Sequence, residues 1–457
     1  MSWSKIDLSV QNNVLLGQRK FWHFFGIGVL ILILYIPFGI ALNISQEIDL
    51  ASIRVLIPVF FLVWLLAAVF SRKKLFVSTF QGFSLICVLV ISAVSLFQAQ
   101  ELSWGLRKLA VFLSIFPLYF LVASFADEKT NSKKTVNILI LGALISALIG
   151  LFQFLSQFFL SSSFLVKFYS EGIGPIFWGK TFSALVAQNP SWFVNVGGGT
   201  LMRAFGLFPD PHMLAFFIGL VLPLALSALL FEKKTDFKLF IIFGLMFVVL
   251  LLTFSRGGYL GLFFSTLVVL LFSWRFLKEK KKFLIFVSFA LFFLIFIIFA
   301  SPVLSRFISS FSMSEGSSLG RIQIWQQAFS TFLEKPILGV GLGNYPKVAD
   351  PLSAYRSPIT SHNLYLDIAT ETGIFGLVIW LFLIFGSFYQ LARSIKDNRT
   401  VQDDKTKERI SLKIGLAGSL GYFAVHSLFE TSIFNPAILA ALMIVFALVS
   451  VSLKPAR

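Results

Sequence analysis

Charge is scarce in this sequence, since only 13% of its 457 residues are Asp, Glu, Lys or Arg, whereas 57% are hydrophobic. A soluble chain of this size could not shield so much apolar surface from water, but a lipid bilayer solvates it. Cysteine is nearly absent, because Cys87 is the only one. This excludes an intramolecular disulfide and a thiolate metal site. The composition therefore indicates an integral membrane protein.

Common motifs of catalysis and cofactor binding are missing as well. The glycine-rich stretch Gly339–Gly343 follows no predicted strand, so it fits neither a dinucleotide site nor a phosphate loop. His212, His362 and His426 are too scattered to predict a zinc site. No Ser-His-Asp pattern with a nucleophile elbow and no outward-facing Asp-X-Asp pair occurs. We therefore expect a protein that works without a metal or another cofactor.

Apolar runs long enough to cross the ~30 Å hydrocarbon layer recur along the chain. The first follows Lys5, Arg19 and Lys20 and has no short apolar core with a cleavage site, so we expect a retained helix and no signal peptide. The fold class predicted is all-α, a polytopic integral membrane protein with about 12 transmembrane helices in a single membrane-embedded domain, residues 1–457. The predicted spans are residues 21–42, 51–70, 75–97, 106–125, 135–158, 211–231, 238–254, 257–274, 283–301, 363–392, 410–429 and 435–453.

The basic residues predict how these spans are oriented. With both termini in the cytoplasm, the cytoplasmic side receives 26 of the 38 Lys and Arg residues but only 10 of the 21 Asp and Glu residues. Because these cations flank helices in short clusters, we expect anionic membrane lipids as partners and no nucleic acid. The cytoplasmic clusters are Ser71–Lys74, Ala126–Lys134, Glu232–Lys238, Arg275–Lys282, Arg393–Lys413 and both termini.

Two segments on the other side are too long to be turns. Residues 159–210 and 302–362 are predicted to be long extracytoplasmic loops, the second of them between spans 9 and 10. Loops of this length in a compact protein usually carry function or are disordered. Neither has the low complexity of a disordered tail, which favours a functional role.

Ionisable side chains close to lipid are costly, so those at the outer ends of the spans are functional candidates. A guanidinium is permanently charged and suits phosphate, which makes Arg203, Arg256 and Arg321 candidate phosphate ligands. Each of them could instead reach the membrane interface by snorkelling, and Arg321 could pair with Glu315 or Glu334. We expect helix packing to gather these arginines around one outward-facing cavity.

His362 stands where the second long loop re-enters the membrane, just before Asn363, a candidate helix N-cap. Imidazole is well suited to accept a proton from a hydroxyl near neutral pH, although a lone histidine is more often structural. Asp367 and Glu371 follow in the first turns of the same helix, where the helix dipole favours carboxylates or where they could orient a base. His426 and Glu430 are further candidates at an outer helix end.

Four motifs, taken in order, resemble a known family. They are Arg203-Ala-Phe-Gly-Leu-Phe-Pro-Asp-Pro-His212, Thr253-Phe-Ser-Arg-Gly-Gly258, Arg321-X-X-X-Trp325, and Pro336 to Asn344 leading to Ser361-His362-Asn363 and Glu371-Thr-Gly-Ile-Phe-Gly376. Together they are similar to the O-antigen ligase and O-antigen polymerase family of bacterial envelope glycosyltransferases. The match extends from about residue 200 to 385, and the first five spans match in hydropathy alone.

The resemblance implies an enzyme of the bacterial cytoplasmic (inner) membrane that moves a glycan from a polyprenyl (undecaprenyl) pyrophosphate carrier to an acceptor hydroxyl. Arginines matching Arg203 and Arg321 would hold the pyrophosphate, with Arg256 as the alternative to Arg321, and His362 would act as general base. Asn363, Asp367, Glu371, His426 and Glu430 would support them. The partners would be a lipid-linked glycan donor and a glycan or lipid acceptor.

Alternative functions remain open at this point. The protein could be a polysaccharide polymerase of the same family, because ligase and polymerase differ only in the acceptor. A transporter or flippase of lipid-linked glycans typically shows repeats and polar groups at mid-membrane, whereas the polar groups here gather at the outer face. A non-catalytic scaffold has no positive feature in its favour. The sequence names neither the sugar nor the acceptor, and it does not fix the oligomeric state.

Overall fold

A computed structural model provides the structure of the chain. It describes residues 20–45, 48–70, 78–127, 130–187, 190–196, 198–232, 236–277, 279, 282, 316–355, 360–397 and 403–454. Helices dominate these residues, and the strands form only two small antiparallel hairpins.

The spanning helices agree closely with the predicted spans. In the described part of the chain, seven helices are long and apolar enough to cross a membrane: Lys20–Phe38, Phe80–Gln98, Leu102–Ala126, Asn131–Ser156, Pro211–Phe231, Arg256–Phe276 and Leu364–Asp397. Ile53–Val69, Phe237–Leu252 and Pro436–Ser452 are shorter apolar helices, and Asp404–His426 is a helix that begins with charged turns. The predicted span 283–301 lies outside the described residues. The all-α polytopic membrane fold is thus confirmed.

The elements used below have the following bounds. The bundle helices are α2 (Ile53–Phe70), α3 (Phe80–Ser95), α4 (Leu102–Ile115), α5 (Pro117–Ala126), α6 (Asn131–Ser156), α10 (Pro211–Phe231), α11 (Phe237–Leu252), α12 (Arg256–Ser273), α16 (Leu364–Asp397), α17 (Asp404–His426) and α18 (Pro436–Ser452). Short 3-10 turns are η1 (Ile36–Phe38), η2 (Leu96–Gln98), η4 (Pro190–Trp192) and η5 (Trp274–Phe276).

Helix α18 and the adjoining faces of α10 and α17 form the centre of the bundle. Every residue from Ile438 to Val449 is fully shielded from solvent. Gly219 of α10 lies directly against the Tyr422 ring of α17, so a larger side chain at position 219 would collide with it. The Tyr422 hydroxyl donates to the carbonyl oxygen of Ala215 at 2.7 Å, which locks the two helices together. This packed centre supports the side chains at the ends of α10 and α17.

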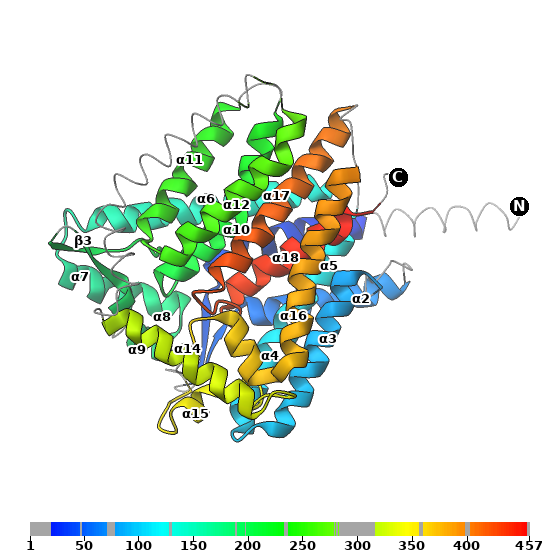
Figure 1. Ribbon diagram of the computed structural model, residues 1–457. Coiled ribbons are helices and arrows are strands. Elements are labelled where there is room, and N and C mark those ends of the chain that lie inside the picture. Colours follow the sequence, from blue (N-terminus) through cyan, green and yellow to red (C-terminus); the bar gives the residue numbers. More distant parts are fainter. Residues whose placement is uncertain are drawn as a thin grey trace, which may run out of the picture.

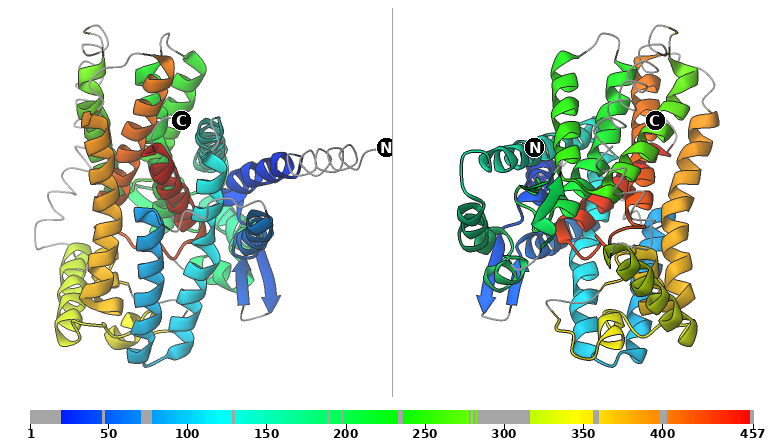
Figure 2. Two further views of the ribbon diagram at one scale, coloured as in Figure 1. Left: turned by 90° about the vertical axis from the view of Figure 1, so that its right-hand side faces the viewer. Right: turned by 60° about the vertical axis from the view of Figure 1, so that its left-hand side comes forward.

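The two long segments predicted outside the spans are structured where they are described. The first holds α7 (Ser162–Lys167), the π-helix η3 (Phe168–Ile173), α8 (Gly174–Phe177), α9 (Lys180–Ala187) and the hairpin β3 (Phe193–Val196) with β4 (Gly199–Met202). The second holds α14 (Gly316–Glu334) and α15 (Tyr345–Ala349). A further hairpin, β1 (Ala41–Ser45) with β2 (Ile48–Ala51), precedes α2. In Figure 1, α9, α14 and α15 lie toward the bottom of the bundle, and α7 and β3 lie at its left edge. The β1–β2 hairpin (blue arrows) lies in the lower half of both views of Figure 2.

Helix starts at this end have strong local signals. Asp210 caps α10, with its carboxylate accepting the backbone N–H groups of His212 at 2.7 Å and Met213 at 3.0 Å, and Pro211 follows at the first helical position. Asn435 and Pro436 repeat this arrangement at α18. Sharp helix starts place the preceding loop residues in defined positions, and those residues include the candidate site.

Candidate functional site

His362 and Glu430, here called the outer pair, meet at the end of the bundle that holds α14 and α15. The His362 Nδ1 lies 3.0 Å from Glu430 Oε1, and the two side chains are 43% and 13% exposed. The hydrogen bond to Glu430 raises the pKa of His362 above its ordinary value of 6.5, while burial and the charge of Arg321 oppose the rise. An imidazole that is bonded on one nitrogen and partly open to solvent can exchange a proton through the other.

The backbone of His362 is strained, with φ at +50°, a region that non-glycine residues seldom occupy. Only Phe254 shares this feature among the non-glycine residues that the structure describes, with φ at +49°. Phe254 lies in the Thr253–Gly258 motif, so both strained residues fall within stretches singled out from the sequence. Such strain persists only where the surroundings impose it, and it concentrates at functional sites.

Asp367 ties together the two chain segments that carry the outer pair. Its Oδ1 accepts the backbone N–H of Ser361 at 2.9 Å, and its carboxylate also accepts the hydroxyl of Thr431. Ser361 precedes His362 and Thr431 follows Glu430, so one buried carboxylate fixes both neighbours. Asp367 can therefore fix the positions of His362 and Glu430 relative to each other, which agrees with the sequence-based interpretation that it could orient a base.

Helix α14 is fastened to the same point. The Trp325 indole donates to the carbonyl oxygen of Ser361 at 2.9 Å, and Arg321 lies one turn earlier on α14. Within the described residues Arg321 has no hydrogen bond or ion pair, and Glu334 is not its partner; Glu315 lies outside the described residues. Its charge nevertheless acts on both His362 and His212, so the Arg321 guanidinium lies near the outer pair with its donors available.

Arg203 begins a buried hydrogen-bonded chain, here called the inner network, that continues through His212 and Ser255 to His426. The Arg203 side chain is 7% exposed. Its Nε donates to the carbonyl oxygen of Thr253 at 2.7 Å, its Nη1 to that of Ser191 at 2.9 Å, and its Nη2 lies 3.5 Å from His212 Nε2. Burial lowers the pKa of Arg203 to about 10, which leaves it charged at neutral pH.

The remaining contacts of the inner network define its proton positions. An arginine can only donate, so His212 accepts at Nε2 and carries its proton on Nδ1, which lies 2.9 Å from Ser255 Oγ. Ser255 Oγ also accepts from the Gly258 backbone and lies 3.2 Å from His426 Nε2, within hydrogen-bond distance. The His426 ring is fully buried and stacks on Phe216, with centroids 3.6 Å apart. The network thus orders four polar groups beneath the outer pair.

The outer segment 159–210 holds Arg203 in place. Arg203 donates its backbone N–H to the Trp192 carbonyl at 2.8 Å, and the Trp192 ring stacks on Phe205 at 4.6 Å between centroids. From α6, the fully buried Gln153 donates to the Arg203 carbonyl at 3.1 Å and accepts the Phe205 N–H at 2.9 Å. We did not single out Gln153 from the sequence. Its signal is an amide within an apolar span, a position where polar groups need partners.

Electrostatic interactions connect the outer pair with the inner network. Glu430 acts on both Arg203 and Asp210, and His362 acts on His212. Burial together with Glu430 raises the pKa of Asp210 to about 6. The structure thus brings the segments around Arg203, Ser255, Arg321, His362 and Glu430 close to one another, although they are distant along the chain.

The other predicted site residues differ in position. Asn363 is the N-cap of α16, because its Oδ1 accepts the N–H groups of Tyr365 at 3.0 Å and Leu366 at 3.2 Å. Arg256 begins α12 and acts electrostatically on Arg203. Glu371 faces away from the base and binds Lys108 of α4 at 2.6 Å. Glu371 thus joins α16 to α4, and it does not contact the outer pair.

Comparisons with known proteins agree with these motifs. Residues 241–381 match the protein family described as O-Antigen ligase. A protein of Rickettsia conorii with the provisional name polysaccharide ligase is 28% identical over 171 residues, which cover 35% of this chain and 40% of that protein. A Rickettsia typhi protein with the same provisional name is 26% identical over 167 residues, which cover 34% of this chain and 41% of that protein. The chain therefore spans about two fifths of the length of the curated relatives it matches. The predicted resemblance to the O-antigen ligase family is confirmed over the segment that carries Arg256, Arg321 and His362.

Proposed function

We propose that this membrane protein is a glycosyltransferase that moves a glycan from a polyprenyl pyrophosphate carrier to an acceptor hydroxyl, as an O-antigen ligase does. The observation that carries the proposal is the outer pair, a partly exposed histidine bonded to a carboxylate, with Arg321 near it and bonded to none of the described residues. A base and a phosphate-binding cation placed side by side suit the attack of a hydroxyl on a phosphate-linked sugar.

His362 acts as the general base in this proposal. Its Nδ1–H donates to Glu430, which leaves the Nε2 lone pair to accept the proton of the acceptor hydroxyl. Glu430 fixes this tautomer and stabilises the imidazolium that forms, the same role that an aspartate has in a Ser-His-Asp triad. As the acceptor oxygen bonds to the anomeric carbon, the bond from that carbon to the pyrophosphate oxygen breaks, and attack from the opposite face inverts the centre.

The leaving pyrophosphate gains negative charge, and arginines stabilise it without a metal ion. Arg321 supplies the freer guanidinium, while Arg203 has already used three of its five N–H donors on protein groups. Arg203 can still offer the other two. Arg256 is retained as the alternative second ligand. Activity should survive EDTA, and a loss restored by Mg²⁺ would contradict metal independence.

The reaction takes place outside the cytoplasm in this proposal, in the bacterial cytoplasmic membrane, with both termini inside. Leu352, which is 92% exposed in the second long segment, and Lys405 at the exposed start of α17 provide matched labelling positions. In a Cys87→Ser background, an impermeant thiol reagent applied to cells with a permeabilised outer membrane should label Leu352→Cys but not Lys405→Cys. The reverse pattern would place the site in the cytoplasm.

Glycan transfer itself is tested with purified protein and a fluorescent lipid-linked oligosaccharide. Lipid-A-core and a second lipid-linked glycan are offered as separate acceptors, because this choice distinguishes a ligase from a polymerase. We expect transfer to lipid-A-core. Movement of the donor across proteoliposomes with no new glycosidic bond would instead identify a flippase.

A further inference from the structure

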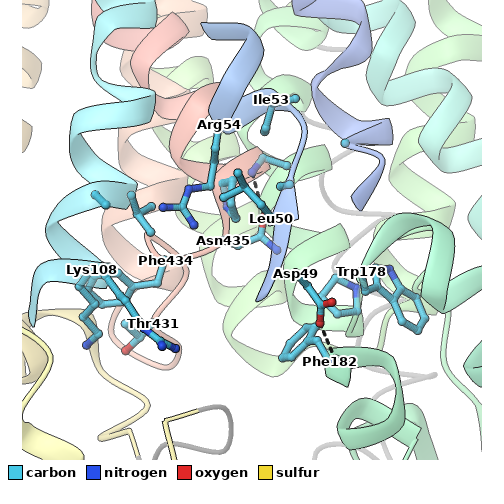
Figure 3. A pocket seen from close by; sticks show the side chains of 18 of the residues that line it. Asp49, Leu50, Ile53, Arg54, Lys108, Trp178, Phe182, Thr431, Phe434 and Asn435 are labelled. Carbon is cyan, nitrogen blue, oxygen red and sulfur yellow. Dashed lines mark hydrogen bonds between the residues drawn. The ribbon is translucent and has the colours of Figure 1, made fainter. Parts of the chain in front are cut away.

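A separate cavity of about 590 Å³ lies among α2, α4, the β1–β2 hairpin and the connection between α17 and α18 (Figure 3). Its volume is typical of a small-molecule site. His362, Arg203 and Arg321 are not among its lining residues. The cavity is therefore distinct from the pyrophosphate and base positions described above, and neither the family match nor the relatives assign a ligand to it.

Two arginines on its wall have no carboxylate partner in the described part of the chain. Arg54, at the start of α2, makes one long hydrogen bond of 3.3 Å to Ser114, and Figure 3 shows its side chain reaching into the cavity between Leu50 and Phe434. Arg107 of α4 lies over the Tyr355 ring, 4.8 Å from its centre. Arg107 is exposed and has this ring face, whereas Arg54 is half-buried, and a half-buried cation is costly unless an anion compensates it.

The acidic groups of the wall bind other partners. Glu371 binds Lys108, Asp367 binds Ser361 and Thr431, and Asp49 Oδ2 accepts the backbone N–H of Phe182 at 3.0 Å. None of these contacts is with Arg54 or Arg107, so an anionic group of a ligand in the cavity can pair with either arginine.

The rest of the lining suits a saccharide. Trp104 and Tyr355 meet edge to face at 5.4 Å, and Phe182 and Phe434 line other parts of the wall. Arg107, Lys347 and Lys108 lie over the rings of Tyr355, Trp104 and Phe434. A sugar ring would therefore pack against the parts of the aromatic wall that these cations leave open, while polar groups of the wall bind hydroxyls. An acidic sugar carries both a negative group for the arginines and a ring for the aromatic wall.

The cavity also adjoins the outer pair. Asp367 and Thr431 belong to its wall, and they hold Ser361 and the residue after Glu430. A sugar in the cavity would therefore lie next to the segments that carry the base. A donor sugar in this place would have to share Arg54 and Arg107 with its own pyrophosphate, whereas an acceptor could present its hydroxyl to His362 without contacting Arg203 or Arg321, which do not line the cavity.

We propose that this cavity binds the acceptor glycan and that Arg54 and Arg107 select acceptors that carry a carboxylate or a phosphate near the reacting hydroxyl. This inference rests on the proposed glycosyl transfer, because only a transferase has an acceptor, but binding of a glycan to the cavity can be measured without turnover. The two charged groups share one chemistry, and separate ligands distinguish them.

The test measures dissociation constants for purified full-length protein in lipid nanodiscs. The probes are hyaluronan tetrasaccharide, which carries carboxylates, maltotetraose bearing one phosphate monoester, and neutral maltotetraose. At least one acidic probe should bind about tenfold or more tightly than the neutral one, since charge-assisted hydrogen bonds contribute this much. Equal affinity for all three, or no binding of any, would overturn the proposal.

Single substitutions test whether the acidic probe binds to Arg54 and Arg107. Arg54→Gln and the more exposed Arg107→Gln should each weaken the acidic probe about tenfold, whereas Arg393→Gln on α16, far from the cavity, should not. If Arg54→Gln proves unstable, Arg107→Gln alone decides. Wild-type affinity in Arg107→Gln would contradict the assignment. Geranylgeranyl pyrophosphate should not compete with the acidic probe, and competition would assign the cavity to the donor instead.

One further variant separates this inference from the proposed function. His362→Gln should bind the acidic probe as the wild type does, because His362 does not line the cavity. Retained, arginine-dependent binding in a wild-type protein that transfers no glycan would refute the transferase proposal and leave the anionic saccharide site standing.

Discussion

The inner network and the outer pair lie in the same part of the molecule and differ in how fully their polar groups are used. In the inner network, Arg203 donates to two backbone carbonyls and meets His212, and His426 is fully buried. In the outer pair, His362 is 43% exposed, and the nearby Arg321 has no hydrogen bond among the described residues. Most polar groups of the inner network are hydrogen-bonded within the protein, with His426 Nδ1 buried and without a partner among the described residues, whereas the outer pair and Arg321 keep open donors and acceptors.

This difference distinguishes polar groups that stabilise the fold from polar groups that can act on a substrate. A polar group that is fully bonded inside the protein contributes order, and its loss leaves buried partners unsatisfied. A group with a free lone pair or a free N–H can act on a ligand. We therefore expect substitutions in the outer pair to change rate more than stability, and substitutions in the inner network to change both or mainly stability.

The largest effect on rate should come from His362→Gln. Loss of a positioned base typically lowers the rate ~10²–10⁴-fold, and donor binding and melting temperature should change little. The base works only when deprotonated, and Glu430 raises its pKa, so the wild-type rate should fall with decreasing pH through a midpoint above 6.5. In Glu430→Gln this midpoint should move to lower pH. A normal single-turnover rate in folded His362→Gln protein would rule out the base.

The same pKa shift affects stability with a definite sign. A histidine whose pKa is raised on folding stabilises the protein below its unfolded pKa, and this contribution is lost as the pH rises through the raised value. The melting temperature of wild type should therefore exceed that of His362→Gln by more at pH 6 than at pH 9. An equal difference at both pH values would show that Glu430 does not favour the charged imidazole.

The two arginines should respond differently to Arg→Lys, which keeps the charge but loses the planar fork. Arg321→Lys should lower the transfer rate about tenfold to a hundredfold at unchanged melting temperature. Arg203→Lys should lower the rate similarly and also destabilise the fold by about 1–3 kcal/mol, because buried carbonyls lose their donors. Rates and thermal melts of both variants decide this. If Arg321→Lys is fully active and Arg256→Lys is not, the second phosphate ligand is Arg256.

A smaller effect is expected from Asp367→Asn, since Asp367 is a positioning residue that binds the neighbours of both members of the outer pair. The kcat should fall about tenfold with the donor KM unchanged, because a misplaced base acts on a normally bound donor. The pH midpoint should also move down, as the Asp367 charge helps to raise the pKa of His362. A purely structural residue would lower the melting temperature and leave the pH profile in place.

The smallest effect on rate should follow Ser255→Ala in the inner network. The change removes a hydroxyl that lies between two imidazoles, so the fold should lose about 1–3 kcal/mol while the rate of the surviving protein changes less than tenfold. Melting temperature and rate per folded molecule are the measurements. A loss of rate comparable with that of His362→Gln would show that the inner network takes part in the chemistry.

The sequence was sufficient to predict the helices and much of the site. Apolar length located the spans, and Asn363 marked the start of α16, since these signals are local. The pairing of His362 with Glu430 was out of reach, because the two are separated by 67 intervening positions along the chain and meet only through packing of α16 on α17. The role of Gln153 and the ion pair of Glu371 with Lys108 depend on packing in the same way.

Helix α16 is longer than a single helix needs to be to cross a membrane. Its 34 residues would extend ~51 Å as one rod, well beyond the ~30 Å of hydrocarbon. Gly373, with φ at +68°, interrupts the rod, and Ile374 donates its backbone N–H to the Pro336 carbonyl outside the helix. The part after Gly373 alone measures ~36 Å, enough to cross. If the part after Gly373 spans the bilayer, the short part before it fixes the distance of His362 from the start of the spanning part. A thinner or thicker membrane would then change the tilt of the spanning part, while the position of His362 relative to Gly373 is set by the protein fold.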